Sequence, residues 1–211
     1  MINLLLMFSF WWLTSSQSLQ PLPATEAMRF KKEMQARLEG INTLSSEFKQ
    51  IRHMDFMDNP IHSQGTFFYQ QPHFVRWNYI APSAHSLLLD GNHLHSYQKG
   101  NSKKTSLQAH RSMRELYTLL NQNNLSKQLF NEQKFTISYF KKGPKMVVRM
   151  VPKEKALAKM MQRIEIQIDT KTLLVDQLIL LEDEGNYTEI MFNKQLINRP
   201  LDPNLFKSPI R

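Results

Sequence analysis

The alternation of apolar and polar residues is clearest in the stretch 65–97. Within it, Val75, Trp77 and Tyr79 fall on one face of a strand, and the residues between them fall on the other face. Prolines and an Asp-Gly turn divide the stretch into four short strands, which predicts an antiparallel meander. Because an apolar strand face must be buried, its many aromatic side chains cover either a second packed layer or an internal cavity.

Similar patterns predict strands along most of the remaining chain. The strands are expected at 43–54, 61–69, 74–79, 86–89, 93–97, 134–140, 145–151, 162–169, 173–181 and 187–192. The polar stretch 99–110 predicts a loop, and the segment 19–23 a short linker. About ten strands with a few helices predict a mainly β protein, in which a curved antiparallel sheet forms an incomplete, half-open barrel.

Helical periodicity appears in two places. Residues 25–39 predict a helix with Thr25 as a candidate N-cap, and Met28, Met34 and Leu38 recur near helical spacing along it. In residues 112–120 the apolar side chains repeat at i, i+3, i+4 and i+7, which predicts a one-sided amphipathic helix. A short helix is expected at 126–130 and a helical turn at 153–160. We expect the middle helices to cover the open end of the sheet.

The N-terminus carries a ten-residue apolar run, 4–13, which is shorter than a membrane span. Ser16 and Ser18 place small residues where a signal peptidase would cleave. We therefore predict a cleaved signal peptide at 1–18 and a single domain at 19–211. The run lacks a preceding Lys or Arg, so an uncleaved anchor is the alternative.

Composition narrows the possible chemistry. The sequence has no cysteine, which excludes disulfides, thiolate metal sites, a cysteine nucleophile and a lipid-modified N-terminal cysteine. The 12 methionines and 13 phenylalanines would make a deformable apolar lining, or would simply fill a β-rich core. The net charge of +9 favours anionic partners, but no aromatic-basic RNA motif accompanies it, and we expect no nucleic-acid partner.

Catalytic motifs are missing from the sequence. We find no Gly-x-Ser-x-Gly, HExxH or P-loop pattern, and the acidic run 182–184 falls in a predicted turn where it would be solvated. His93 and His95 have ligand-like spacing on one strand face, but no carboxylate or thiolate stands with them in a known pattern. We therefore expect no metal, no cofactor and no enzymatic activity, with Leu94 inside and both histidines on the solvent face.

A set of residues in order along the chain resembles a known family. The set is Phe48-x-Gln50, Gly65-x-Phe67, Pro72-x-x-x-Arg76-Trp77-x-Tyr79-x-x-Pro82, Asp90-Gly91, Tyr97, Gly185-Asn186, Asn198 and Phe206. In this order and spacing the chain resembles the periplasmic outer-membrane lipoprotein carriers, the LolA-like family. The resemblance covers most of the chain after the predicted signal peptide.

The resemblance implies a half-open antiparallel β-barrel with helices as a lid. It implies a periplasmic chaperone, expected as a monomer, that binds the acyl chains of lipoproteins in an apolar cavity. Such carriers take cargo from an inner-membrane ABC transporter and deliver it to an outer-membrane lipoprotein acceptor. No bond is made or broken in this transfer.

Eight residues are the candidates for this role. We predict that Phe67, Val75, Trp77 and Leu88 line the cavity and that Met113, Leu116 and Leu120 form lid contacts, with ordinary core packing the alternative for each. In the family a basic residue often precedes the proline that matches Pro72 and bonds the lid. Gln71 stands there in this chain, and it donates hydrogen bonds without charge assistance.

Three other functions remain open from the sequence. The first is a LolA-like carrier of another lipid or acylated intermediate in a separate export pathway. The second is a basic module that binds polyanions, with binding that weakens steeply as salt rises. The third is a hydrolase, which would need a serine, a histidine and an acid brought together by the fold.

Overall fold

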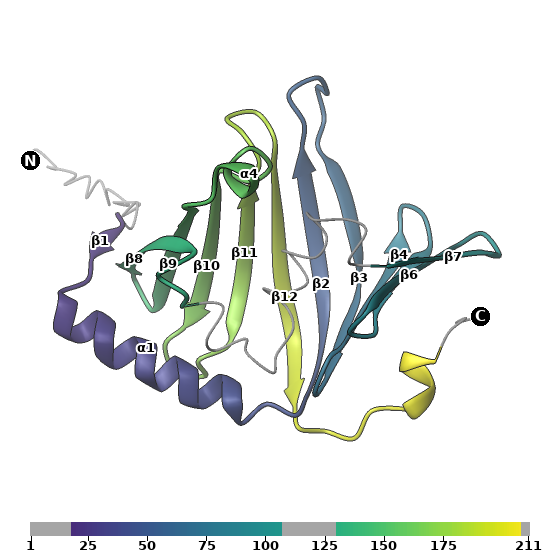
Figure 1. The fold of residues 1–211 in the computed structure, drawn as a ribbon, viewed down its shortest axis with the longest axis horizontal. Helices are drawn as coiled ribbons and strands as arrows, with labels where there is room; N and C mark the ends of the chain where they lie inside the picture. Colours follow the sequence, from purple (N-terminus) through teal and green to yellow (C-terminus); the bar gives the residue numbers. More distant parts are fainter. Residues whose placement is uncertain (1–17, 107–129, 208–211) are drawn as a thin grey trace, which may run out of the picture.

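In the computed structural model, which describes residues 18–106 and 130–207, twelve strands form one curved antiparallel sheet (Figure 1). The strand order is β1-β8-β9-β10-β11-β12-β2-β3-β4-β5-β6-β7. The sheet is not closed into a barrel, which confirms the predicted fold class. The strands β12 and β2 pair near its centre and thereby join the two halves of the sequence.

The strands have the following bounds. They are β1 (Gln20–Pro21), β2 (Thr43–His53), β3 (Ile61–Gln70), β4 (Phe74–Ala81), β5 (His85–Leu89), β6 (His93–Gln98), β7 (Asn101–Ser106), β8 (Phe135–Lys142), β9 (Lys145–Pro152), β10 (Arg163–Asp169), β11 (Val175–Leu181) and β12 (Tyr187–Ile197). All ten predicted strands are present, with small shifts at their ends.

Two strands were not predicted. The strand β7 lies in the stretch 99–110, which was predicted as a loop because it is polar. All six residues of β7 are polar, and most are exposed. It forms through backbone pairing with β6 at the edge of the sheet, which requires no apolar side chains. The two-residue β1 lies in the predicted linker and pairs with Phe140 and Lys141 of β8.

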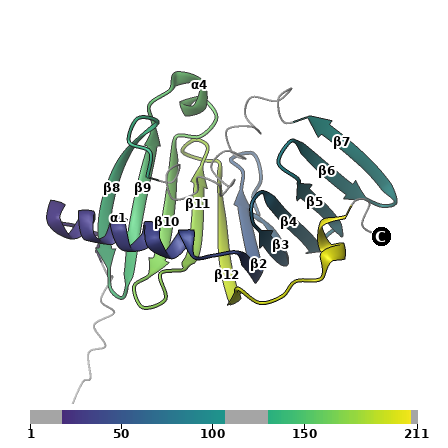
Figure 2. The same ribbon diagram turned by 60° about the horizontal axis from the view of Figure 1, so that its bottom comes forward.

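The helix α1 (Ala24–Glu39) runs across the lower ends of β8 to β11 in Figure 1 and in front of these strands in Figure 2. It buries Phe30, Met34 and Leu38 in the same core cluster as side chains of the sheet. We call the sheet face toward α1 the inner face and the other face the outer face. Thr25 lies inside the helix rather than at its N-cap, because the helix begins at Ala24 after Pro23.

Other helical elements are short. The helix α4 (Lys155–Ala158) occupies the predicted helical turn, and the 3₁₀ helix η3 (Pro203–Phe206) lies against β4. The helices predicted at 112–120 and 126–130 fall outside the described residues, apart from Phe130. None of the helices in the described ranges has the length and apolarity needed to cross a bilayer.

The strand β10 shows how the sheet separates its two faces. Ile164, Ile166 and Ile168 are buried on the inner face. Glu165, between them, faces outward and accepts a hydrogen bond of 2.9 Å from Arg149 of β9. The apolar core therefore sits on the inner face, and this part of the outer face carries charged pairs.

Candidate functional site

An aromatic cluster lies on the inner face where β2, β3, β4 and β12 are adjacent. Its centre is Trp77, whose ring centroid lies 4.7 Å from Phe67, 4.9 Å from Phe48 and 5.9 Å from Phe192. Phe67 and Trp77 are paired across β3 and β4, and Phe48 and Phe192 across β2 and β12. The pleat of four neighbouring strands thus gathers these rings on one face.

A polar contact borders this cluster. The hydroxyl of Tyr79 donates a 3.0 Å hydrogen bond to Oε1 of Gln50, two residues along β2 from Phe48. Burial raises the pKa of the Tyr79 hydroxyl, so this group stays a neutral donor at ordinary pH. The contact links Phe48-x-Gln50 with Trp77-x-Tyr79, because each strand supplies one aromatic ring and one partner of the hydrogen bond.

Of the residues predicted to line a cavity, three share the inner face. Val75 is 1% exposed and Phe67 9%, and both belong to the core cluster against which Trp77 packs. Leu88 lies on the opposite face, because it pairs with Arg76 while its neighbour Leu87 pairs with Trp77. Alternation in the sequence could not show which of these leucines faces inward, since residues 87–89 are all leucine.

Arg76 is buried on the outer face. Alternation correctly predicted that it points away from Trp77, yet it is only 4% exposed. Its guanidinium donates to Oδ1 of Asn78 and, at 2.7 Å, to the carbonyl oxygen of Leu205 in η3. Burial lowers the pKa of Arg76 to about 10. This arginine therefore holds the C-terminal segment against β4 and does not touch the aromatic cluster.

Gln71, the predicted position of lid control, bonds the segment that follows α1. Its Nε2 donates to the carbonyl oxygen of Ile41 at 3.0 Å, and its backbone N–H donates to the carbonyl oxygen of Asn42 at 2.8 Å. The side chain thus ties the β3–β4 turn to the α1–β2 connection. The predicted lid residues Met113, Leu116 and Leu120 lie outside the described residues.

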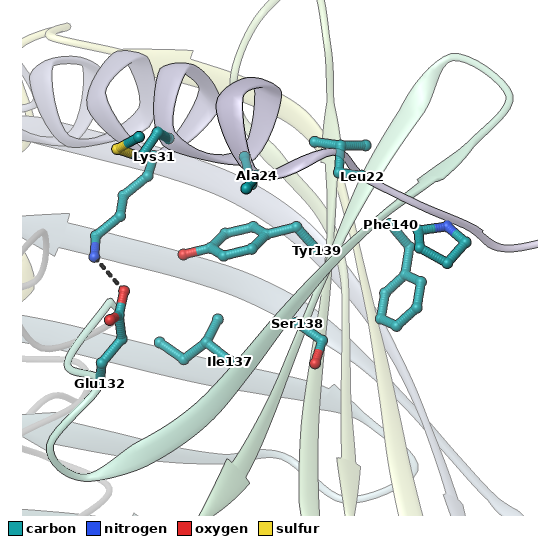
Figure 3. A pocket seen from close by; sticks show the side chains of 11 residues that line it. Leu22, Ala24, Lys31, Glu132, Ile137, Ser138, Tyr139 and Phe140 are labelled. Carbon is teal, nitrogen blue, oxygen red and sulfur yellow. Dashed lines mark hydrogen bonds and ion pairs between the residues drawn. The ribbon is translucent and has the colours of Figure 1, made fainter.

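A pocket of about 510 Å³ lies between α1 and β8 (Figure 3). Its lining includes Leu22, Ala27, Met28, Lys31, Ile137 and Tyr139. Lys31 pairs with Glu132 at 2.6 Å beside the Tyr139 ring. Sequence reasoning missed this pocket, although Ile137 and Tyr139 alternate along β8, because the position of α1 over β8 is set by tertiary packing.

The hydroxyl of Tyr139 is buried without a hydrogen-bond partner. Burial, with a smaller contribution from the negative charge of Glu132, raises the pKa of this hydroxyl to about 12. Met28, at 68% exposure, contributes a flexible thioether side chain to the same pocket. The pocket therefore offers apolar walls that border the inner face, with one uncompensated polar atom.

The sequence also places the chain in a family. The family model described as "Outer membrane lipoprotein carrier protein LolA" matches residues 39–209. The chain belongs to this family. The match begins at the last residue of α1 and includes every strand of the sheet except β1. It confirms the resemblance to LolA-like proteins, and LolA membership suggests a carrier of lipid or lipoprotein.

Solved structures align with this chain at low sequence identity. MucB aligns with a TM-score of 0.53 and 11% identity over 88% of this chain and 63% of its own. An uncharacterized conserved protein from Thermus thermophilus aligns with a TM-score of 0.51 and 8% identity over 84% of this chain and 93% of its own. A LolA superfamily protein from Nitrosomonas europaea aligns at 0.47, with 8% identity over 86% and 97%. No curated relative matches the sequence.

Proposed function

We propose that this LolA-family protein is a periplasmic carrier, without enzymatic activity, that shelters the acyl chains of lipoproteins against the inner face of its sheet. It receives them from an inner-membrane ABC transporter and delivers them to an outer-membrane acceptor. The observation that carries the proposal is the aromatic cluster around Trp77, which lies on the inner face of an open sheet.

The physical argument rests on the apolar area of that face. Each methylene removed from water contributes roughly 0.8 kcal/mol, so an acyl chain bound there is strongly favoured over one exposed to water. Aromatic and methionine side chains adapt to chains of varied length without specific hydrogen bonds. The pocket beside Tyr139 borders the same face and could take the end of a chain.

The residues proposed as a lid stand between β7 and β8 in the sequence. The described chain leaves the sheet at β7, at one edge, and returns at β8, next to the other edge. The connection between the two edges contains Met113, Leu116 and Leu120. We propose that these residues compete with the acyl chain for the inner face, which would make release possible.

Trp77 offers a direct test of binding. In the form that begins at Leu19, Trp77 is the one tryptophan, since the other two stand at 11 and 12. A diacyl lipid brominated along its chains should quench Trp77 fluorescence, and the matching lipid without bromine should not. An acyl chain on the inner face brings bromine into contact with the indole. Unquenched Trp77 at saturating lipid would contradict the proposal.

A matched pair of variants on β3 tests which face binds. Phe67 lies on the inner face, and Phe68 pairs with Arg76 on the outer face. A phenylalanine contributes about 1.5–3 kcal/mol when buried, so Phe67→Asn should weaken lipid binding about tenfold or more. Phe68→Asn should leave it nearly unchanged. Circular dichroism of both variants checks that each is folded.

To identify the cargo, the protein must be purified with its bound ligand from its native cell envelope. Mass spectrometry of the purified complex should recover triacylated lipoproteins if the protein serves lipoprotein transfer. Recovery of a different lipid would favour the second candidate, a carrier in a separate export pathway. The observation favouring that candidate is Gln71, which bonds Ile41 without the charge of the basic residue usual at this position. An empty protein that binds polyanions in low salt would contradict both.

A further inference from the structure

Asp90, His93 and His95 bring three metal-ligating side chains together at the β5–β6 hairpin. One ligand atom from each residue lies within 4.8 Å of the other two. Oδ2 of Asp90 is 2.7 Å from Nε2 of His95, and Oδ1 is 3.5 Å from Nδ1 of His93. From the sequence we expected no metal here, because no carboxylate stood near the two histidines in a known ligand pattern. In the structure, the hairpin turn places the carboxylate of Asp90 beside both of them.

The hairpin fixes the carboxylate before any ligand binds. Oδ1 of Asp90 accepts hydrogen bonds from the backbone N–H groups of Asn92, at 3.0 Å, and His93, at 2.8 Å. Gly91, with a φ of 100°, allows the tight turn that brings Asp90 over the first residues of β6. The carboxylate is therefore positioned by the backbone of the turn, as expected of a ligand held by surrounding hydrogen bonds.

The two histidines share one face of β6. They are two residues apart, and Leu94 between them packs toward the core cluster on the inner face. His95 pairs with Leu88, which in turn pairs with Arg76, so the three candidate ligands lie on the outer face. This site is consequently separate from the aromatic cluster, and its failure would leave the proposed carrier function untouched.

One separation within the cluster already matches a tetrahedral site. Zinc binds imidazole nitrogen and carboxylate oxygen at about 2.0–2.2 Å, which places neighbouring ligand atoms about 3.3–3.5 Å apart. The Asp90–His93 separation already has this value. His95 contacts the other carboxylate oxygen, Oδ2, and must move away from it by roughly 0.6–0.8 Å, exchanging this hydrogen bond for a metal bond.

The site is also open to a fourth ligand. The side chains of His95, Asp90 and His93 are 16%, 25% and 34% exposed, so water can complete the coordination. Lys104, which pairs with His95 from β7, is the exposed cation nearest in register and would weaken binding moderately. We propose that Asp90, His93 and His95 form a binding site for one divalent transition-metal ion of the zinc class.

The donor set determines the class of metal. Two imidazoles and one carboxylate suit Zn²⁺ and its neighbours in the first transition row. Calcium and magnesium prefer sites built wholly from oxygen. The site should therefore discriminate strongly against these two ions.

The test uses untagged protein stripped of metal, titrated with Zn²⁺ in a calorimeter. We expect one ion per chain, no saturable binding of Mg²⁺, and a visible absorption band of four-coordinate character when Co²⁺ replaces Zn²⁺. His93→Gln and His95→Gln should each weaken Zn²⁺ binding at least tenfold. The control is His62→Gln, which removes an exposed histidine from β3 and should bind like the parent protein.

Thermal unfolding provides a second measurement. Zn²⁺ should raise the midpoint of the parent protein and of His62→Gln, but not that of the His93→Gln, His95→Gln double variant, because only a folded-state site stabilises by mass action. Equal Zn²⁺ affinity in the double variant and the parent would overturn the proposal, as would a parent protein that binds no Zn²⁺. Circular dichroism of the metal-free variants excludes misfolding as the cause of lost binding.

Discussion

Phe48 on β2 and Gly65 on β3 lie directly opposite each other, and the Phe48 ring occupies the space above the glycine. A Cβ atom at position 65 would stand 2.9 Å from the Phe48 ring and 1.8 Å from the carbonyl oxygen of Asn78 on β4. The second contact involves backbone, which cannot move without opening the β3–β4 pairing. Glycine at this position therefore allows three strands and the aromatic cluster to approach closely.

We predict that Gly65→Ala lowers the free energy of unfolding by about 2 kcal/mol or more, the usual range for overpacking or beyond it. The matched control is Gly40→Ala, where the added Cβ would meet its nearest atom at an ordinary 3.6 Å. Urea unfolding of both variants measures the difference. Equal stability of the two would show that β4 adjusts freely to the methyl group.

Removal of two tyrosine hydroxyls on the inner face should change the free energy of unfolding differently. Tyr139→Phe deletes a buried hydroxyl without a partner and should leave stability unchanged or raise it by up to about 1 kcal/mol. Tyr79→Phe deletes the donor to Gln50 and should cost about 1–1.5 kcal/mol. Equilibrium unfolding of the pair checks the sign. A Tyr139→Phe variant less stable than Tyr79→Phe would contradict the hydrogen-bond assignment.

Stability should fall as the pH rises from 10 to 12. The pKa of Tyr139 is raised from 10.0 to about 12 in the folded protein, chiefly by burial. Across this window the unfolded chain releases the tyrosine proton while the folded chain retains it, so the free energy of unfolding decreases. Denaturant unfolding at a series of pH values should show a shallower decrease for Tyr139→Phe. Identical slopes for both proteins would refute the cause assigned here.

Asn198 closes the corner between α1, β2 and β12. Its Oδ1 accepts from the backbone N–H of Asn42 at 2.7 Å, and its Nδ2 donates to the carbonyl oxygen of Gly40 at 2.8 Å. The residue also has a φ of 54°, which asparagine tolerates better than alanine. We predict that Asn198→Ala lowers the free energy of unfolding by about 2 kcal/mol.

The control for this corner is Lys194→Ala. Lys194 also has a positive φ, of 51°, and its side chain pairs with Glu47 at 2.8 Å on the surface. Loss of an exposed pair should cost about 0–1 kcal/mol. Thermal or urea unfolding compares the two variants. If both alanine variants lose the same stability, the hydrogen bonds of Asn198 contribute nothing beyond a surface pair.

The pattern of the chain predicted most of the sheet and part of the candidate site. Alternation placed Val75 and Trp77 on one face and Arg76 on the other, because in a strand the side chain's direction follows from its position in the sequence. The same signal failed at Leu88, within a run of leucines that has no polar member to mark a face. It also failed at β7, where backbone pairing alone makes the strand.

Contacts between segments that are distant in the chain could not be predicted from the sequence. Nothing local to Arg76 shows that the carbonyl of Leu205 covers it, so its burial could not be predicted. The pocket at Tyr139 depends on where α1 crosses β8. Gln71 could be singled out only through the family resemblance, and its partner Ile41 came from the structure.

The sequence by itself determined a curved antiparallel sheet, because period-two alternation and turn residues act locally along the chain. Its LolA-like kind followed from the ordered motif residues that resemble the family. Only the tertiary structure decided which side chains meet: the rings around Trp77, the carboxylate of Asp90 beside two histidines, and the C-terminal segment over Arg76. These contacts depend on the strand register and on the path of α1, and both are determined by the packing of the complete sheet.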